Sequence, residues 1–395
     1  MNDTAPHRVV VIGGGYAGLT TAARIGEQNS ELDLTLIDAK PQFVERIRLH
    51  EIATGSHAGH LPYAEFMTAR NGRFVEGRVS AIDAGNCVVH LDPGPEEPDI
   101  IGYDTLVYAL GSYTDRETIP GAARFAACLD TPSGSKALAT RLGAAAASGG
   151  TVLIAGGGLT AIEAACEFGE RFPDLKIVLA PGRKFGPNPE PGGLSRAGFD
   201  HVAVTLHRLK VEIASGARIS QLRADHAVLE SGGTIPFDVC LWAAGFLVPP
   251  LAANAGISVT ASSQIITDET LISVSHPNIL AVGDAAHVMA APAGKCRMSC
   301  AAGRPMGELA AKTFSGLNDG GILRPFEFSY SFRCVSLGRE DGLIQFVDAH
   351  DRPVEQVWTG ARGARWKEYI CRRTLAGIGF DTGLGEPPDT PPQIS

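Results

Sequence analysis

The stretch VVVIGGGYAG, residues 9–18, decides the fold of this chain. An apolar run typical of a buried strand comes first, and Gly13, Gly15 and Gly18 follow in the order G-x-G-x-x-G before a helix-like segment. In such a turn the first glycine permits the tight bend, the second lets a pyrophosphate approach the backbone, and the third lets helix and strand pack closely. The helix N-terminus then offers unpaired N–H groups to the anion. The stretch predicts a dinucleotide-binding βαβ unit.

An acid completes this first unit. The next apolar run, residues 32–37, ends at Asp38, where a carboxylate would accept hydrogen bonds from a ribose diol. The glycine pattern alone would also suit a tight turn in an ordinary α/β protein. Strand, helix and terminal acid together favour dinucleotide binding. Further residues of this region are predicted to contact the same cofactor: Tyr16, Ala17, Ala39, Lys40 and Arg46.

The unit occurs a second time. Residues 151–163, TVLIAGGGLTAIE, repeat the pattern with Gly156, Gly158 and Ala161 as G-x-G-x-x-A. The internal duplication carries more weight than either copy, and it predicts two dinucleotide sites on one chain.

The second copy lacks the acid. Its second strand, KIVLA, ends at Ala180, and Arg183 and Lys184 follow. An acid at this place suits the ribose 2′-hydroxyl of NADH, whereas a nearby arginine meets the 2′-phosphate of NADPH. We therefore expect NADPH to be accepted at least as well as NADH. The alternative is that both cations belong to a solvated turn and that NADH binds through its pyrophosphate.

Two later segments have similar sequences, YDTLVYALGS at 103–112 and FDVCLWAAG at 237–245. Each is typical of a buried strand that ends in a glycine turn. A further apolar strand, residues 278–282, is followed by Gly283 and Asp284, and ligands of open α/β folds bind at such carboxyl ends. The predicted cofactor contacts of these segments are Ala109, Gly111, Gly245, Gly283 and Asp284.

The composition of the whole chain narrows the classes of protein. Its 395 residues suffice for two or three domains, and its net charge of −9 argues against nucleic acid as a partner. The N-terminal residues contain no apolar signal segment, so we expect no export. Eight cysteines without a CxxC pair predict reduced thiols in the cytoplasm, and no metal site is predicted.

Changes of composition along the chain suggest its domains. We expect an α/β protein with two Rossmann-like domains, each a three-layer ββα arrangement, and a small α+β region at the C-terminus. The Gly/Pro-rich tail is predicted to be disordered. The expected boundaries are 1–113 with 256–325 for the first domain, 114–255 for the second, 326–380 for the C-terminal region and 381–395 for the tail.

Two charged segments allow two interpretations each. Arg46, Arg48, His50 and Glu51 crowd a short segment that is either a solvated helix face or a cationic segment beside the cofactor; its place after the first unit favours the second interpretation. The basic helix expected at 364–378 could dock on an anionic membrane surface or pack as a lid over the cofactor.

Together these motifs resemble the flavoproteins with two dinucleotide-binding domains, over residues 8–315. Within that group the chain looks most like the type II NADH:quinone dehydrogenases. HEIATG, residues 50–55, resembles their flavin-side segment, and residues 326–380 match their C-terminal extension in length and place. The disulfide reductase subclass is disfavoured, because residues 39–60 contain no redox cysteine pair.

The resemblance implies FAD in the first domain and NAD(P)H in the second. By it, the first glycine turn and Asp38 hold the ADP half of FAD, the backbone near Val79 meets the adenine, and Asp284 meets the ribityl chain. Cys296 and its neighbours would place a helix N-terminus at the flavin N1–C2 carbonyl, where reduction leaves negative charge that a helix dipole stabilises. Cys296 and Cys300 are interpreted as buried small residues or, alternatively, as a thiol relay.

The resemblance also implies catalytic residues. Glu163 matches a family glutamate between nicotinamide and isoalloxazine, and Lys367 matches a C-terminal lysine near the flavin. Arg48 and His50 complete the predicted catalytic set. The chain departs from the family at Ile47–Arg48, where a proline-leucine pair is usual. A cation there could admit an acidic or phenolic acceptor.

The leading hypothesis is an enzyme in which NAD(P)H reduces FAD by hydride transfer and the flavin passes electrons to a quinone-like acceptor. Three alternatives stay open: a flavin-dependent oxidoreductase of a biosynthetic intermediate, a sulfide:quinone-type thiol and flavin enzyme, and a redox-responsive binding flavoprotein. Besides the acceptor, the candidate partners are the inner face of the membrane and a second copy of the chain.

Overall fold

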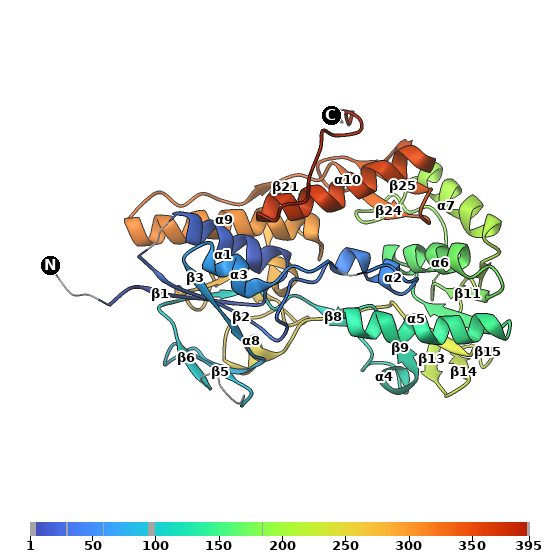
Figure 1. Cartoon of the computed structure of the whole chain (residues 1–395), viewed down its shortest axis with the longest axis horizontal. Coiled ribbons are helices and arrows are strands. Elements are labelled where there is room, and N and C mark those ends of the chain that lie inside the picture. The colour runs from blue at the N-terminus through green and yellow to red at the C-terminus, as the bar shows by residue number, and fades with distance from the viewer. Residues whose placement is uncertain (1–4, 29–30, 58, 94–98, 184, 393–395) are drawn as a thin grey trace.

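The structure, a computed structural model, describes residues 5–28, 31–57, 59–93, 99–183 and 185–392. Figure 1 shows two α/β domains side by side, with helix α10 (Gly360–Ile378) lying along the top edge of the molecule. The predicted α/β class with two Rossmann-like domains is confirmed.

A five-stranded parallel sheet forms the centre of the first domain, in the order β19-β7-β1-β2-β3. Helices lie on one side of this sheet and a small antiparallel sheet lies on the other (Figure 1). Because both faces are covered, the central strand is a continuous apolar run without alternation. The parallel strands are β1 (Arg8–Ile12), β2 (Asp33–Asp38), β3 (Gly72–Glu76), β7 (Thr105–Tyr108) and β19 (Ile279–Ala281). The two covering layers are helices α1 (Tyr16–Gln28) and α9 (Cys300–Asp319), and strands β4 (Val79–Asp83), β5 (Val88–Leu91) and β6 (Ile100–Gly102).

The second domain repeats this plan with a parallel sheet in the order β12-β11-β10-β16-β9. Its central strand alternates between two cores: Val152 and Ile154 pack with the helices, and Leu153 and Ala155 pack toward an antiparallel three-stranded sheet. The parallel strands are β9 (Ala126–Ala127), β10 (Thr151–Ala155), β11 (Lys176–Ala180), β12 (Glu212–Ile213) and β16 (Val239–Trp242). The covering elements are helices α5 (Pro132–Ala147), α6 (Leu159–Arg171) and α7 (Arg196–Arg208), and strands β13 (Ile219–Leu222), β14 (His226–Leu229) and β15 (Thr234–Pro236).

Two short strands join the domains. β8 (Tyr113–Thr114) leaves the first domain and pairs antiparallel with β17 (Phe246–Leu247), which returns from the second. Val248 and helix α8 (Leu251–Asn254) already belong to the first domain, since they contribute to its core. The predicted boundary after residue 255 therefore lies C-terminal to the observed crossover.

The C-terminal region is a three-stranded antiparallel sheet with α10 packed against it. Trp358 and Trp366 join the two, with ring centroids 5.4 Å apart. The sheet consists of β24 (Phe332–Ser336), β25 (Gly342–Val347) and β26 (Pro353–Trp358). The remaining short elements are η1 (Arg46–Arg48), α2 (Leu49–Ile52), α3 (Tyr63–Thr68), α4 (Ala122–Phe125), β18 (Ile265–Ile266), η2 (Gly283–Ala285), β20 (Ala286–His287), β21 (Met289–Pro292), β22 (Gly294–Lys295) and β23 (Glu327–Phe328).

The described part of the tail beyond α10 makes contacts with that helix. Residues 381–392 form neither helix nor strand, but the Arg362 guanidinium pairs with Asp389 at 2.5 Å. The Arg372 guanidinium donates to the backbone oxygens of Thr382 and Gly383 at 2.5 and 3.0 Å. The described part of the tail therefore lies against α10.

Candidate functional site

The first glycine turn has the backbone shape of a phosphate cradle. Gly13 has a φ of +96°, and a Cβ atom there would collide with the carbonyl oxygen of Ala109. A Cβ at Gly18 would collide with the carbonyl oxygen of Gly13, so helix α1 can pack this closely only with glycine there. At Gly15, by contrast, no atom lies within 4 Å of a Cβ position. The middle glycine therefore leaves its backbone approachable from outside, as a pyrophosphate requires.

Asp38 lies beside this turn at the end of β2. Its carboxylate accepts the N–H groups of Gly14 at 2.7 Å and Lys40 at 2.9 Å. Burial raises the pKa of this carboxyl above its ordinary value. The N–H of Gly77 donates to the Asp38 carbonyl at 2.9 Å, which brings Val79, at the start of β4, and exposed Ala39 to the same corner.

Asp284, at the end of β19, faces the other side of the turn. The Ser112 hydroxyl donates to its carboxylate at 2.7 Å, and burial raises the pKa of the carboxyl. Gly283 beside it has a φ of +71° and lies against Ala17. Arg46 donates to the Ser112 carbonyl at 2.5 Å, so this predicted residue also reaches the edge of the first sheet.

The helical pattern that the sequence shows from about Ser299 agrees with the observed start of helix α9. Its N-cap is Ser299, whereas Cys296 lies before the helix, where its N–H donates to the Val288 carbonyl at 3.0 Å. Cys296 therefore does not supply a free N–H at a helix N-terminus, and burial raises the pKa of its thiol to about 11. The Ser299 and Tyr16 hydroxyls are buried and have no hydrogen-bond partner among the described residues. Buried hydroxyls usually find a partner, so a polar ligand fits here.

The second glycine turn repeats the first. Gly156 has a φ of +136°, and a Cβ there would lie 2.5 Å from the carbonyl oxygen of Ala243. No atom lies within 4 Å of a Cβ position at Gly158, and fully buried Ala161 packs in the core. Gly245 has a φ of +74° at the same sheet edge. The structure thus offers a second cradle of the same backbone shape.

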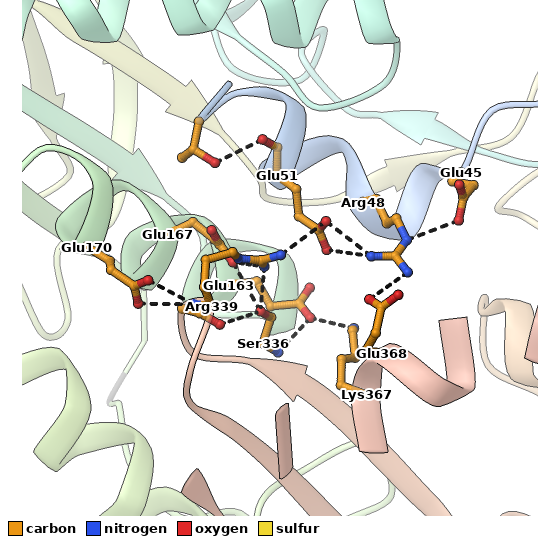
Figure 2. Close-up of polar contacts among 12 residues, drawn as sticks. Glu45, Arg48, Glu51, Glu163, Glu167, Glu170, Ser336, Arg339, Lys367 and Glu368 are labelled. Atoms are coloured by element: carbon orange, nitrogen blue, oxygen red, sulfur yellow. Dashed lines mark hydrogen bonds and ion pairs between the residues drawn. The ribbon is translucent and has the colours of Figure 1, made fainter. Parts of the chain in front are cut away.

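Glu163 of α6, in the second domain, and Lys367 of α10, in the C-terminal region, form an ion pair. The Lys367 ammonium lies 2.8 Å from the Glu163 carboxylate, and the N–H of Ser336 donates to the same oxygen at 3.0 Å (Figure 2). Burial alone would raise the pKa of Glu163, but the Lys367 charge holds it below its ordinary value. Burial likewise opposes the charge on Lys367, yet Glu163 holds the pKa of this lysine above its ordinary value. Both groups are charged at neutral pH.

Three glutamates on one face of α6 bind the loop after β24. Glu163 accepts from the Ser336 N–H, Glu167 from the Ser336 hydroxyl at 3.2 Å, and Glu170 from the Arg339 N–H at 3.0 Å (Figure 2). The Arg339 guanidinium also pairs with Glu167. Sequence reasoning missed this set, although three carboxylates spaced i, i+4 and i+7 on one helix face were a visible signal.

Arg48 is bound by three carboxylates. Its guanidinium lies 3.1 Å from Glu45, 3.2 Å from Glu51 and 2.8 Å from Glu368 of α10 (Figure 2). Arg339 contacts Glu51 as well, at 3.2 Å. The prediction that Arg48 presents a cation to an acidic acceptor therefore needs correction, because these glutamates already neutralise it. Arg48 instead ties η1 and α2 to α10.

His50 is buried beside this pair. Its Nε2 atom has no hydrogen-bond partner among the described residues. Burial lowers the pKa of His50; Glu163 acts against this lowering and Lys367 adds to it. The structure therefore gathers the four predicted catalytic residues at one junction of α2, α6 and α10. Arg183 lies elsewhere, beyond β11, and Lys184 is outside the described residues.

The comparisons with known proteins agree with this geometry. Residues 7–303 match the model of the pyridine nucleotide-disulphide oxidoreductase family, and the chain belongs to that family. The predicted family is thus confirmed, and it implies the use of a flavin and a pyridine nucleotide.

Individual relatives narrow the comparison. The chain is 29% identical to an NADH dehydrogenase-like protein of Mycobacterium tuberculosis, over 77% of this chain and 78% of that protein. It is 25% identical to the type II NADH:quinone oxidoreductase of Staphylococcus aureus, over 96% of both chains. The sulfide:quinone oxidoreductase structure from Aquifex aeolicus shares the fold, with a TM-score of 0.79 and 19% identity over 94% of this chain and 91% of that one.

The buried His50 makes stability depend on pH. Because its pKa is lowered in the folded state, the folded protein binds fewer protons than the unfolded chain below about pH 6.5. The contribution of neutral His50 to the free energy of unfolding is present above that pH and is lost as the pH falls through the pKa of His50 in the folded protein. We expect His50→Gln to reduce the drop in melting temperature between about pH 7 and pH 5. Exposed His57→Gln is the control, and an equal drop in all three proteins would contradict the expectation.

Proposed function

We propose that this chain is an FAD-dependent NAD(P)H oxidoreductase that passes electrons to a quinone-like acceptor. The observation that carries the proposal is the presence of two phosphate cradles on one chain, with a buried ion pair between the second domain and α10 of the C-terminal region. The full-length match to a protein named type II NADH:quinone oxidoreductase supports the quinone as acceptor class.

The first cradle fits FAD. Gly15 leaves the backbone approachable for a pyrophosphate, and Asp38 stands at the end of β2, where a ribose acceptor is needed. The buried, unpaired hydroxyls of Tyr16 and Ser299 provide polar atoms for the ring system or its side chain. When bound, the flavin accepts hydride from nicotinamide and gives electrons to the acceptor. The second cradle, at Gly156 and Gly158, takes the nicotinamide dinucleotide.

The chain's own residues tune this chemistry through charge. With a flavin bound in the first cradle, the N-terminal N–H groups of α9 and the ammonium of Lys367 would act as positive partners for negative charge on it. Glu163 keeps Lys367 charged and anchored, since the pair is buried. His50 is a neutral buried base at neutral pH and is a candidate to move a proton there.

The thiol mechanism is less well supported than the quinone proposal. All eight cysteines are free thiols. Burial raises the pKa of both Cys296 and Cys300, so neither thiol is inclined to form the reactive thiolate.

The experiment is an anaerobic titration of the purified protein with NADPH and with NADH, followed by addition of quinones. We expect a yellow protein that releases FAD on denaturation, loses its flavin absorbance on titration and recovers it with a quinone. Colourless protein that takes up no added FAD would contradict the cofactor assignment. Reduced protein that no quinone reoxidises would contradict the acceptor class and favour a redox-responsive binding protein.

The exposed face of α10 suggests a peripheral membrane contact. None of the described helices is long and apolar enough to cross a bilayer. The exposed side of α10 carries four arginines, and Arg362 and Arg372 among them already bind the tail. The four are Arg362, Arg365, Arg372 and Arg373. We propose that this face meets anionic lipid and that the tail competes for it.

Deleting residues 381–395 should therefore strengthen binding to anionic vesicles. The deletion removes Asp389 and frees the arginine face, so more protein should sediment with phosphatidylserine vesicles at low salt. Neutral phosphatidylcholine vesicles are the control for charge. No sedimentation of either the full chain or the deletion would remove the membrane proposal.

A further inference from the structure

The two dinucleotide units can be aligned by their own hydrogen bonds. In the first, the N–H of Gly13 donates to the Ile37 carbonyl at 2.8 Å; in the second, the N–H of Gly156 donates to the Ala180 carbonyl at 2.9 Å. These bonds make Ile37 and Ala180 equivalent positions. The residue after each is therefore also equivalent: Asp38 in the first unit and Pro181 in the second.

The corner that holds a carboxylate in the first unit is filled by a proline ring in the second. Asp38 accepts the N–H of Gly14 at 2.7 Å. At the matching glycine, Gly157, a Cβ atom would lie 2.9 Å from the Cβ of Pro181. The second unit thus has no side-chain acceptor there for a ribose 2′-hydroxyl. It also has no carboxylate there to repel a 2′-phosphate.

A cation, Arg183, stands two residues further on, and the backbone at 183 and at 185 is hydrogen-bonded to the turn at 215–216. The N–H of Gly216 donates to the Arg183 carbonyl at 3.2 Å, and the N–H of Phe185 donates to the Ser215 hydroxyl at 3.3 Å. The N–H of Ala214 donates to the Leu179 carbonyl at 2.9 Å, which ties the same turn to β11. The Arg183 side chain itself is exposed to solvent.

A second arginine borders the same turn. Arg218 is exposed and lies 3.8 Å from exposed Glu230, a separation at which a surface ion pair is weak. Glu212, at the start of β12, is also exposed. The surface beside β11 therefore presents Arg183, Arg218 and the Ser215 hydroxyl.

We propose that Arg183, with the turn at 214–218, forms a subsite for the 2′-phosphate of NADPH, so that the chain uses NADPH in preference to NADH. This rests on the proposed function, in which the second cradle takes a pyridine nucleotide. A guanidinium donates to phosphate oxygens in a planar fork, and the missing acid removes the group that would select NADH. This preference would distinguish the chain from the relatives that are named for NADH.

The test uses two fragments that differ only in the phosphate, adenosine 2′,5′-bisphosphate and adenosine 5′-phosphate. Isothermal titration should show the bisphosphate binding the wild-type chain at least about tenfold more tightly, as one charge-assisted contact provides. Arg183→Ser should lose roughly that factor for the bisphosphate and leave the monophosphate unchanged. The matched control is Arg223→Ser, an exposed arginine that follows the far end of β13, which should change neither affinity.

Equal affinity for both fragments in the wild-type chain, or no loss in Arg183→Ser, would overturn the subsite. Pro181→Asp provides a second test, because it places an acid where the first unit has Asp38. This change should weaken bisphosphate binding and raise kcat/KM for NADH relative to NADPH. Fragment binding requires neither acceptor nor turnover. If the chain binds the bisphosphate more tightly but does not turn over NAD(P)H with a quinone, only the proposed function is contradicted. If it turns over but binds both fragments equally, only the subsite is contradicted.

Discussion

Glu163 and Lys367 form a buried ion pair, 2.8 Å long, on which the arrangement of the C-terminal region depends. One partner stands on α6 of the second domain and the other on α10. Taking a charge out of water costs several kcal/mol per ion, so each group tolerates its burial only because the other is present. The pair therefore fixes α10 against α6, and with α10 come the Arg48–Glu368 contact and the loop that begins at Ser336.

The duplicated unit shows how one backbone design serves two ligands. Gly13 and Gly156 both adopt positive φ, and both are excluded from carrying a side chain by a facing carbonyl. The difference lies in one corner, where Asp38 in one unit corresponds to Pro181 in the other. The backbone shape of each cradle thus depends on steric limits that only glycine satisfies. We propose that the side chain at the end of the neighbouring strand determines which ligand binds.

The sequence predicted the parts of the fold that are encoded locally. The glycine turns, the apolar strands and Asp38 are read from a few adjacent residues, and they lie where they were expected. The start of α9 near Ser299 was also read from local pattern, whereas the place of Cys296 before the cap was not visible in it. The domain crossover before α8 was likewise invisible, since it depends on which core Val248 joins.

The long-range pairings explain most of what sequence reasoning missed. Two carboxylates that bind Arg48 are close in sequence, but the third, Glu368, lies more than three hundred residues away and could not be foreseen. Glu167 and Glu170 were not singled out from the sequence, because the loop at Ser336 and Arg339 that covers them belongs to another region of the chain. A pattern of charged residues indicates that ion-pair partners exist, but the tertiary fold determines which residues they are.

The most direct test of this account is a comparison of Glu163→Gln, Lys367→Met and the double variant by thermal unfolding of the purified protein. Each single change leaves one buried charge without its partner, which typically costs about 3–5 kcal/mol. Glu163→Gln retains an oxygen for the Ser336 N–H, so the loss of charge is isolated from the loss of a hydrogen-bond acceptor. The account predicts that both single variants melt at least about 5 °C below wild type and that the double variant recovers most of the difference. A double variant that melts lower than either single variant would contradict it.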